Sequence, residues 1–149
     1  MTKDKLMFTL SVCSNAVAFI ILIYTWVPGL YNAFDTIFSI FVDKKMLAIA
    51  VICIFAAFSL ISGLYYFKTG TESKLKTLVT INSLLTMLII MVFGMIGISA
   101  GSTLGEVPPW RQLSIMNAGW IFLFVSILLT AANVFLSAQF IKNSKSFLK

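Results

Sequence analysis

The chain has 149 residues, of which 60% are apolar and 11% are charged, and its mean hydropathy is +1.01. These values lie outside the range of soluble globular domains, so we expect an integral membrane protein with one domain, residues 1–149. The formal net charge of +6 comes from lysines that flank apolar segments, and it predicts no nucleic-acid partner.

Four uncharged apolar segments follow one another along the chain, and each is long enough to cross a bilayer as a helix. A hydrocarbon core of about 30 Å requires about 20 residues at a rise of 1.5 Å per residue. The segments contain no Asp, Glu, Lys or Arg and cover residues 6–27, 46–67, 78–100 and 115–141. Because the connections are short, we expect an all-α membrane protein in which four transmembrane helices form an antiparallel bundle.

The connection between the first two spans has a pattern of its own. Within residues 30–42 apolar side chains recur every three or four positions, and polar side chains occupy the opposite face. This periodicity predicts a short amphipathic helix on the outer side. Its polar face carries Asp35 and no Lys or Arg, which disfavours recognition of anionic lipids there. Two placements stay open, one in the outer membrane interface and one across the mouth of the bundle.

The distribution of basic residues predicts the orientation. Eight of the 11 basic residues fall on one side, namely Lys3, Lys5, Lys68, Lys74, Lys76, Lys142, Lys145 and Lys149. Only Lys44, Lys45 and Arg111 fall on the other side. Since cytoplasmic loops carry the excess of Lys and Arg, both termini should be cytoplasmic, on the inner side. Tyr65 and Tyr66 then lie at the inner boundary, where they fit an aromatic belt.

The sequence offers few groups for catalysis. It has no histidine, so the common zinc and haem ligand sets and histidine acid/base chemistry are missing. Cys13 and Cys53 lie at depths that differ by roughly 10 Å, too far apart for a disulfide. The five acidic residues lie outside the spans and are Asp4, Asp35, Asp43, Glu72 and Glu106. We expect no enzyme activity, no catalytic residues, no metal site and no cofactor.

Small and weakly polar residues lie on one face of each span. Lipid provides no hydrophobic force between helices, so close backbone approach and hydrogen bonds across helices must hold a bundle together. We therefore interpret these residues as helix-packing or partner-facing positions. They are Asn15, Asn82, Gly94, Gly97, Gly101, Gly119, Ser126, Thr130 and Asn133.

An antiparallel arrangement would place Asn82 near Asn133 and Ser137 at the inner end. Two other interpretations of the polar faces stay open. The faces could line a water-filled path for small solutes, or the face of the third span could contact a separate protein.

We therefore expect a non-enzymatic integral membrane protein that serves as an accessory or structural subunit of a larger membrane assembly. Its partners would be the lipid bilayer and other membrane protein subunits or further copies of itself. The alternative is a small oligomeric channel or transporter for a neutral or weakly discriminated solute. A third hypothesis, a membrane-perturbing or immunity-type protein, rests only on the amphipathic segment.

Overall fold

Four helices form the whole of the described structure. The computed structural model describes residues 2–26, 45–103 and 118–145, and side chains within 2–23, 46–95 and 124–145. The helices are α1 (Lys3–Trp26), α3 (Lys45–Thr69), α4 (Ser73–Thr103) and α6 (Ala118–Ser144), with no strand among the described residues. All four are long and apolar enough to cross a membrane, so the prediction of an all-helical fold with four helices of membrane-spanning length is confirmed for the described residues. The predicted amphipathic helix at 30–42 lies outside the described residues.

Every helix extends beyond its predicted apolar segment at the end where α3 connects to α4. Helix α1 begins three residues before position 6, and α4 begins five residues before position 78. Helices α3 and α6 end two and three residues beyond positions 67 and 141. The added turns contain Lys, Ser and Thr, whose side chains reach water at the interface while the helical backbone satisfies its own hydrogen bonds. Hydropathy alone therefore underestimated the helix lengths at this end.

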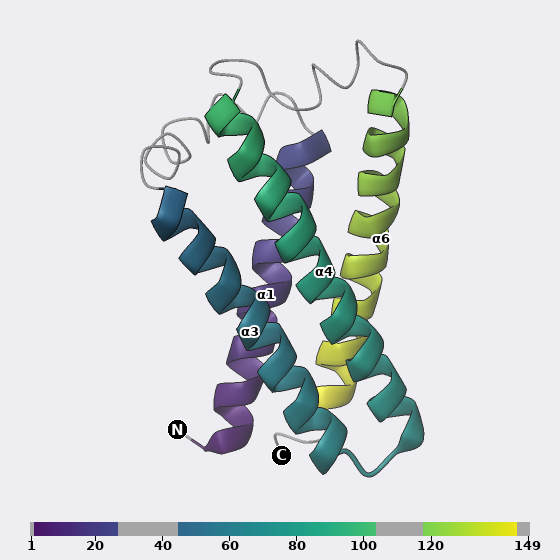
Figure 1. Cartoon of the computed structure of the whole chain (residues 1–149). Coiled ribbons are helices and arrows are strands. Elements are labelled where there is room, and N and C mark those ends of the chain that lie inside the picture. Colours follow the sequence, from purple (N-terminus) through teal and green to yellow (C-terminus); the bar gives the residue numbers. More distant parts are fainter. Residues whose placement is uncertain (1, 27–44, 104–117, 146–149) are drawn as a thin grey trace.

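The helices lie side by side in one bundle (Figure 1). The start of α1, the connection between α3 and α4, and the end of α6 lie at the same end of the bundle, which we call the 69–73 end. Side-chain contacts agree with this placement. Phe8 of α1 stacks on Phe140 of α6, and Tyr66 of α3 packs edge-on against the same ring, with centroids 6.0 and 5.2 Å apart. The most extensive helix–helix contact is between α3 and α4.

Polarity in the bundle is inverted relative to a water-soluble protein. Twelve of the 23 buried side chains are polar, whereas large apolar side chains are exposed on every helix. An apolar exterior of this kind is unfavourable in water and matches the hydrocarbon of a bilayer. The most exposed of these side chains are Met46, Phe124, Phe135, Leu128 and Leu64.

The interior is divided into three layers along the bundle axis. At the 69–73 end, an apolar layer contains Tyr66, Leu75, Val79 and Phe140. Towards the opposite end, a second apolar layer contains Ala18, Leu22, Ala56, Ile89, Ile90 and Phe93. On each helix the positions between these two layers carry buried amides, hydroxyls or glycine. We call these positions the polar layer.

Helices α3 and α4 are in close contact within the polar layer. The hydroxyl of Ser83 donates to the carbonyl oxygen of Ser59 at 2.7 Å, and the hydroxyl of Ser59 donates to the carbonyl oxygen of Ser83 at 3.1 Å. One turn further along α3, Gly63 faces the same serine. A Cβ atom at Gly63 would lie 2.5 Å from the Ser83 Cβ, so only glycine permits this spacing.

The two glycines on this interface should respond differently to alanine. In Gly63→Ala the new methyl group meets the fixed Cβ of Ser83, so we expect a loss of about 1–3 kcal/mol in the free energy of unfolding. In Gly94→Ala the nearest atom, at 2.7 Å, is the terminal Cδ1 of Ile52, which can rotate away. The control should therefore stay within about 0.5 kcal/mol of the wild type. Unfolding in mixed micelles by denaturing detergent measures both values, and equal losses would contradict this description of the interface.

Candidate functional site

The polar layer is built around the side chain of Asn15 on α1. Its Oδ1 accepts hydrogen bonds from the Thr86 hydroxyl of α4 at 2.9 Å and from the Ser137 hydroxyl of α6 at 2.8 Å. Its Nδ2 donates to the carbonyl oxygen of Ser11 at 2.8 Å, one turn back on its own helix. The amide of Asn133 on α6 donates to the backbone oxygen of Asn15 at 3.4 Å. One residue therefore joins three of the four helices.

The local sequence explains why these groups meet. Asn15 follows Ser11 by four residues, so both lie on one face of α1. On α6, Asn133 and Ser137 share a face for the same reason. The Asn15 side chain reaches α4 and α6 together because α1 packs against both helices. Hydroxyl side chains are short, so they reach an amide oxygen on another helix only where the two helices pack in direct contact.

Two amide oxygens in the same layer have no hydrogen-bond partner in the described part of the chain. They are Oδ1 of Asn82 and Oδ1 of Asn133, on residues that are 2% and 1% exposed. An unpaired buried amide oxygen costs about 1–3 kcal/mol. The polar layer therefore contains two amide oxygens, one on α4 and one on α6, that can accept further hydrogen bonds.

The predicted site residues divide into three groups. Asn15, Asn82, Ser126, Thr130 and Asn133 are all buried. Gly94 lies on α4 against Ile52 of α3. Gly97 and Gly101 lie in α4 and Gly119 lies in α6, where the structure describes the helix but not the side-chain surroundings.

The expected proximity of Asn82 to Asn133 and Ser137 stays a prediction, because no hydrogen bond among the described residues joins them. Ser137 and Asn133 bond to Asn15 instead. Thr130 donates within its own helix, to the carbonyl oxygen of Ser126 at 2.7 Å. The sequence did not identify Asn15 as the partner of Asn133 and Ser137, because helical periodicity indicates which face a residue occupies but not its position along the bundle axis relative to a neighbouring helix.

Two features were not anticipated from the sequence. Ser83 joins α4 to α3 through two hydrogen bonds with Ser59, and its only signal in the sequence is its position next to Asn82 in a span otherwise rich in Leu and Ile. Tyr66, expected in an aromatic belt, is 1% exposed and belongs to the apolar layer at the 69–73 end. Its neighbour Tyr65 donates a hydrogen bond to the carboxylate of Asp4, which links α3 to the start of α1.

The chemistry available in the polar layer is hydrogen bonding between neutral groups. The described residues contain no cluster of three or more His, Cys, Asp or Glu side chains that could hold a metal ion. Cys13 and Cys53 are free and exposed on the outside of the bundle. Amides and hydroxyls of this kind can join helices or bind water and neutral polar solutes.

Comparison of the chain with known protein families, curated proteins and solved structures finds no match.

Asn15 and Asn82 offer a matched test of this description, because both are buried asparagines in one layer. Asn15→Leu removes the acceptor of two hydroxyls from two other helices, and we expect a loss of about 1–2 kcal/mol. Asn82→Leu removes an unpaired oxygen and keeps the branched shape, so its free energy of unfolding should stay equal or rise. Unfolding by denaturing detergent measures both. A loss in Asn82→Leu as large as that in Asn15→Leu would mean that Asn82 has a bound partner.

Proposed function

We propose that the chain is a non-enzymatic, multi-pass membrane protein that acts as an accessory or structural subunit of a larger membrane assembly. The observation that supports this best is the arrangement of the polar layer. Its hydroxyls and the amide of Asn15 bond from helix to helix, and apolar layers lie on both sides of it. Groups used in this way hold helices together and leave no ionisable side chain to carry a reaction.

The exterior supports association within the membrane. Large apolar side chains cover the exposed faces of the described helices, and they fit lipid chains and the apolar helices of neighbouring subunits equally well. The expected partners are therefore the bilayer and other membrane protein subunits, or further copies of this chain.

The proposal includes an antiparallel bundle with both termini on the inner side. In support, the described part of the 69–73 end carries Lys3, Lys5, Lys68, Lys74, Lys76, Lys142 and Lys145. A concentration of lysines on one side of short connections is the usual feature of a cytoplasmic face. The same proposal includes a short amphipathic helix at 30–42 on the outer side of the bundle.

A second candidate, a small channel or transporter for a neutral solute, is favoured by one observation. The unpaired oxygens of Asn82 and Asn133 could accept hydrogen bonds from water or a polar solute within the bundle. The apolar layers on either side of them oppose a continuous aqueous path through a single copy. This candidate therefore requires several copies of the chain or a rearrangement of the helices.

Purification in mild detergent distinguishes the two candidates. For a subunit we expect a second membrane protein to co-purify in a fixed ratio, and liposomes that contain the chain alone should show no flux of neutral solutes. Asn82→Leu should leave the co-purification unchanged, since this side chain lies inside the bundle. A pure homo-oligomer whose solute flux falls in Asn82→Leu would replace the first proposal with the second.

The proposed orientation can be tested with single cysteines at the start of α3 and just after its end. In a Cys13→Ala, Cys53→Ala background, Met46→Cys and Thr71→Cys each place one thiol at an exposed position. A maleimide that cannot cross membranes should label Met46→Cys on intact cells and Thr71→Cys only after permeabilisation. Labelling of both from one side would refute a membrane-spanning α3, and the reversed pattern would refute inner termini.

A further inference from the structure

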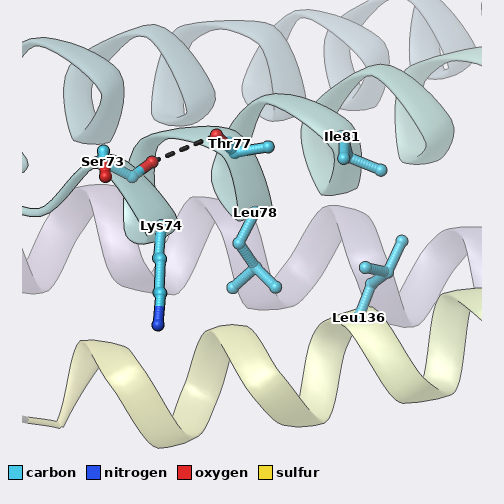
Figure 2. A pocket seen from close by; sticks show the side chains of 6 residues that line it. All are labelled: Ser73, Lys74, Thr77, Leu78, Ile81 and Leu136. Carbon is cyan, nitrogen blue, oxygen red and sulfur yellow. Dashed lines mark hydrogen bonds between the residues drawn. The ribbon is translucent and has the colours of Figure 1, made fainter.

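A shallow groove lies between the first turns of α4 and the facing part of α6, at the 69–73 end. Figure 2 shows Lys74 and Leu78 extending from α4 towards α6, while Leu136 extends from α6 into the same space. The lining residues are Ser73, Lys74, Thr77, Leu78, Ile81 and Leu136.

The groove changes character along the helix axis. Its beginning, in the first turn of α4, carries Ser73, Lys74 and Thr77. One to two turns further into the membrane the lining becomes apolar, with Leu78 and Ile81 on α4 and Leu136 on α6. Positions 73 and 81 are separated by about 12 Å at 1.5 Å per residue. A polar, cationic mouth followed by an apolar channel matches a phospholipid, whose headgroup lies at the interface and whose chains point inward.

The electrostatics of this end favour an anionic headgroup. Its described residues include seven lysines and two acids, Asp4 and Glu72, so its formal charge is 7 − 2 = +5. The Asp4 carboxylate accepts a hydrogen bond from Tyr65, and Lys76 lies over the Phe67 ring at 6.0 Å. Among the described residues, Lys74 forms no ion pair. Its ammonium group is therefore available to a ligand at the mouth of the groove.

We propose that this groove binds an anionic phospholipid of the leaflet at the 69–73 end. The Lys74 ammonium and the Ser73 hydroxyl donate hydrogen bonds to the phosphate. One acyl chain lies along Leu78, Ile81 and Leu136. The hydroxyl of Thr77 already donates to the Ser73 carbonyl oxygen at 3.1 Å, so it contributes to the polar edge without donating to the lipid. This site depends on membrane insertion alone and is compatible with either function proposed above.

Lipid binding to the full-length protein in detergent tests the headgroup contact. Native mass spectrometry with added phosphatidylglycerol or phosphatidylcholine gives the affinity for each lipid. Lys74→Gln should weaken phosphatidylglycerol binding about fivefold, as expected for one lysine near a lipid surface. It should weaken phosphatidylcholine binding less, because the choline cation already balances the charge of that lipid's phosphate. Lys68→Gln is the control, because it removes the same charge from the same end outside the groove. Equal weakening in both variants would overturn the site in favour of diffuse attraction.

The apolar half of the groove has its own pair of variants. Ile81 and Ile61 are 50% and 49% exposed, and only Ile81 lines the groove. Ile81→Trp should fill the acyl-chain path and lower the binding of both lipids, whereas Ile61→Trp should lower neither.

Thermal unfolding distinguishes a lipid from free phosphate as the ligand. Inorganic phosphate added instead of lipid should give no protection against thermal unfolding. Equal protection by inorganic phosphate and phosphatidylglycerol, or full lipid binding in Ile81→Trp, would overturn the proposal.

Discussion

The absence of water inside a bilayer is the constraint on which the whole bundle depends, and Asn15 shows how the chain meets it. In water, the amide of Asn15 would exchange solvent hydrogen bonds for internal ones at little net gain. In hydrocarbon, an amide without partners is expensive, so the hydroxyls of Thr86 and Ser137 must be brought to it from two other helices. The same requirement pairs Ser59 with Ser83 on the other side of the bundle. Helix association is thus directed by a few polar groups, while their apolar neighbours fill the remaining space.

The layered interior follows from the same constraint. Helices with apolar surfaces gain nothing from hydrophobic burial within lipid, so close packing must supply the rest of the attraction. Gly63 allows α3 to reach the Cβ of Ser83, which brings the two serine hydroxyls within bonding distance of the opposite backbone. Aromatic side chains then close the 69–73 end, where Tyr66 packs against Phe140. Glycine, serine and aromatic residues therefore have separate roles in one contact surface.

Much of this architecture could be predicted from sequence, and the part that could not has a physical explanation. Four apolar runs of about 20 residues without charges predict four helical spans, because a helix of this length crosses the hydrocarbon core and satisfies its own backbone. Helical periodicity also placed Asn15, Asn82 and Asn133 on faces that turn out to be buried. It could not identify Asn15 as the residue that bonds to Ser137, because relative height depends on crossing angles and on connections between helices. Nor could it reveal that Tyr66 turns inward, since an aromatic residue near a span end fits an interface equally well.

The polar layer also fixes the positions of α1, α4 and α6 relative to one another along the bundle axis. Apolar helix surfaces in lipid can slide past one another at small cost, because leucine meets leucine or lipid with similar energy. A displacement of one turn, about 5.4 Å, would separate the Asn15 amide from the hydroxyls of Thr86 and Ser137 and break both hydrogen bonds. A single buried asparagine sets register in this way in coiled coils, at some expense in stability. In this bundle the same reasoning makes Asn15 a residue that selects one arrangement of α1, α4 and α6, and the subunit role that we propose would require such a constant surface.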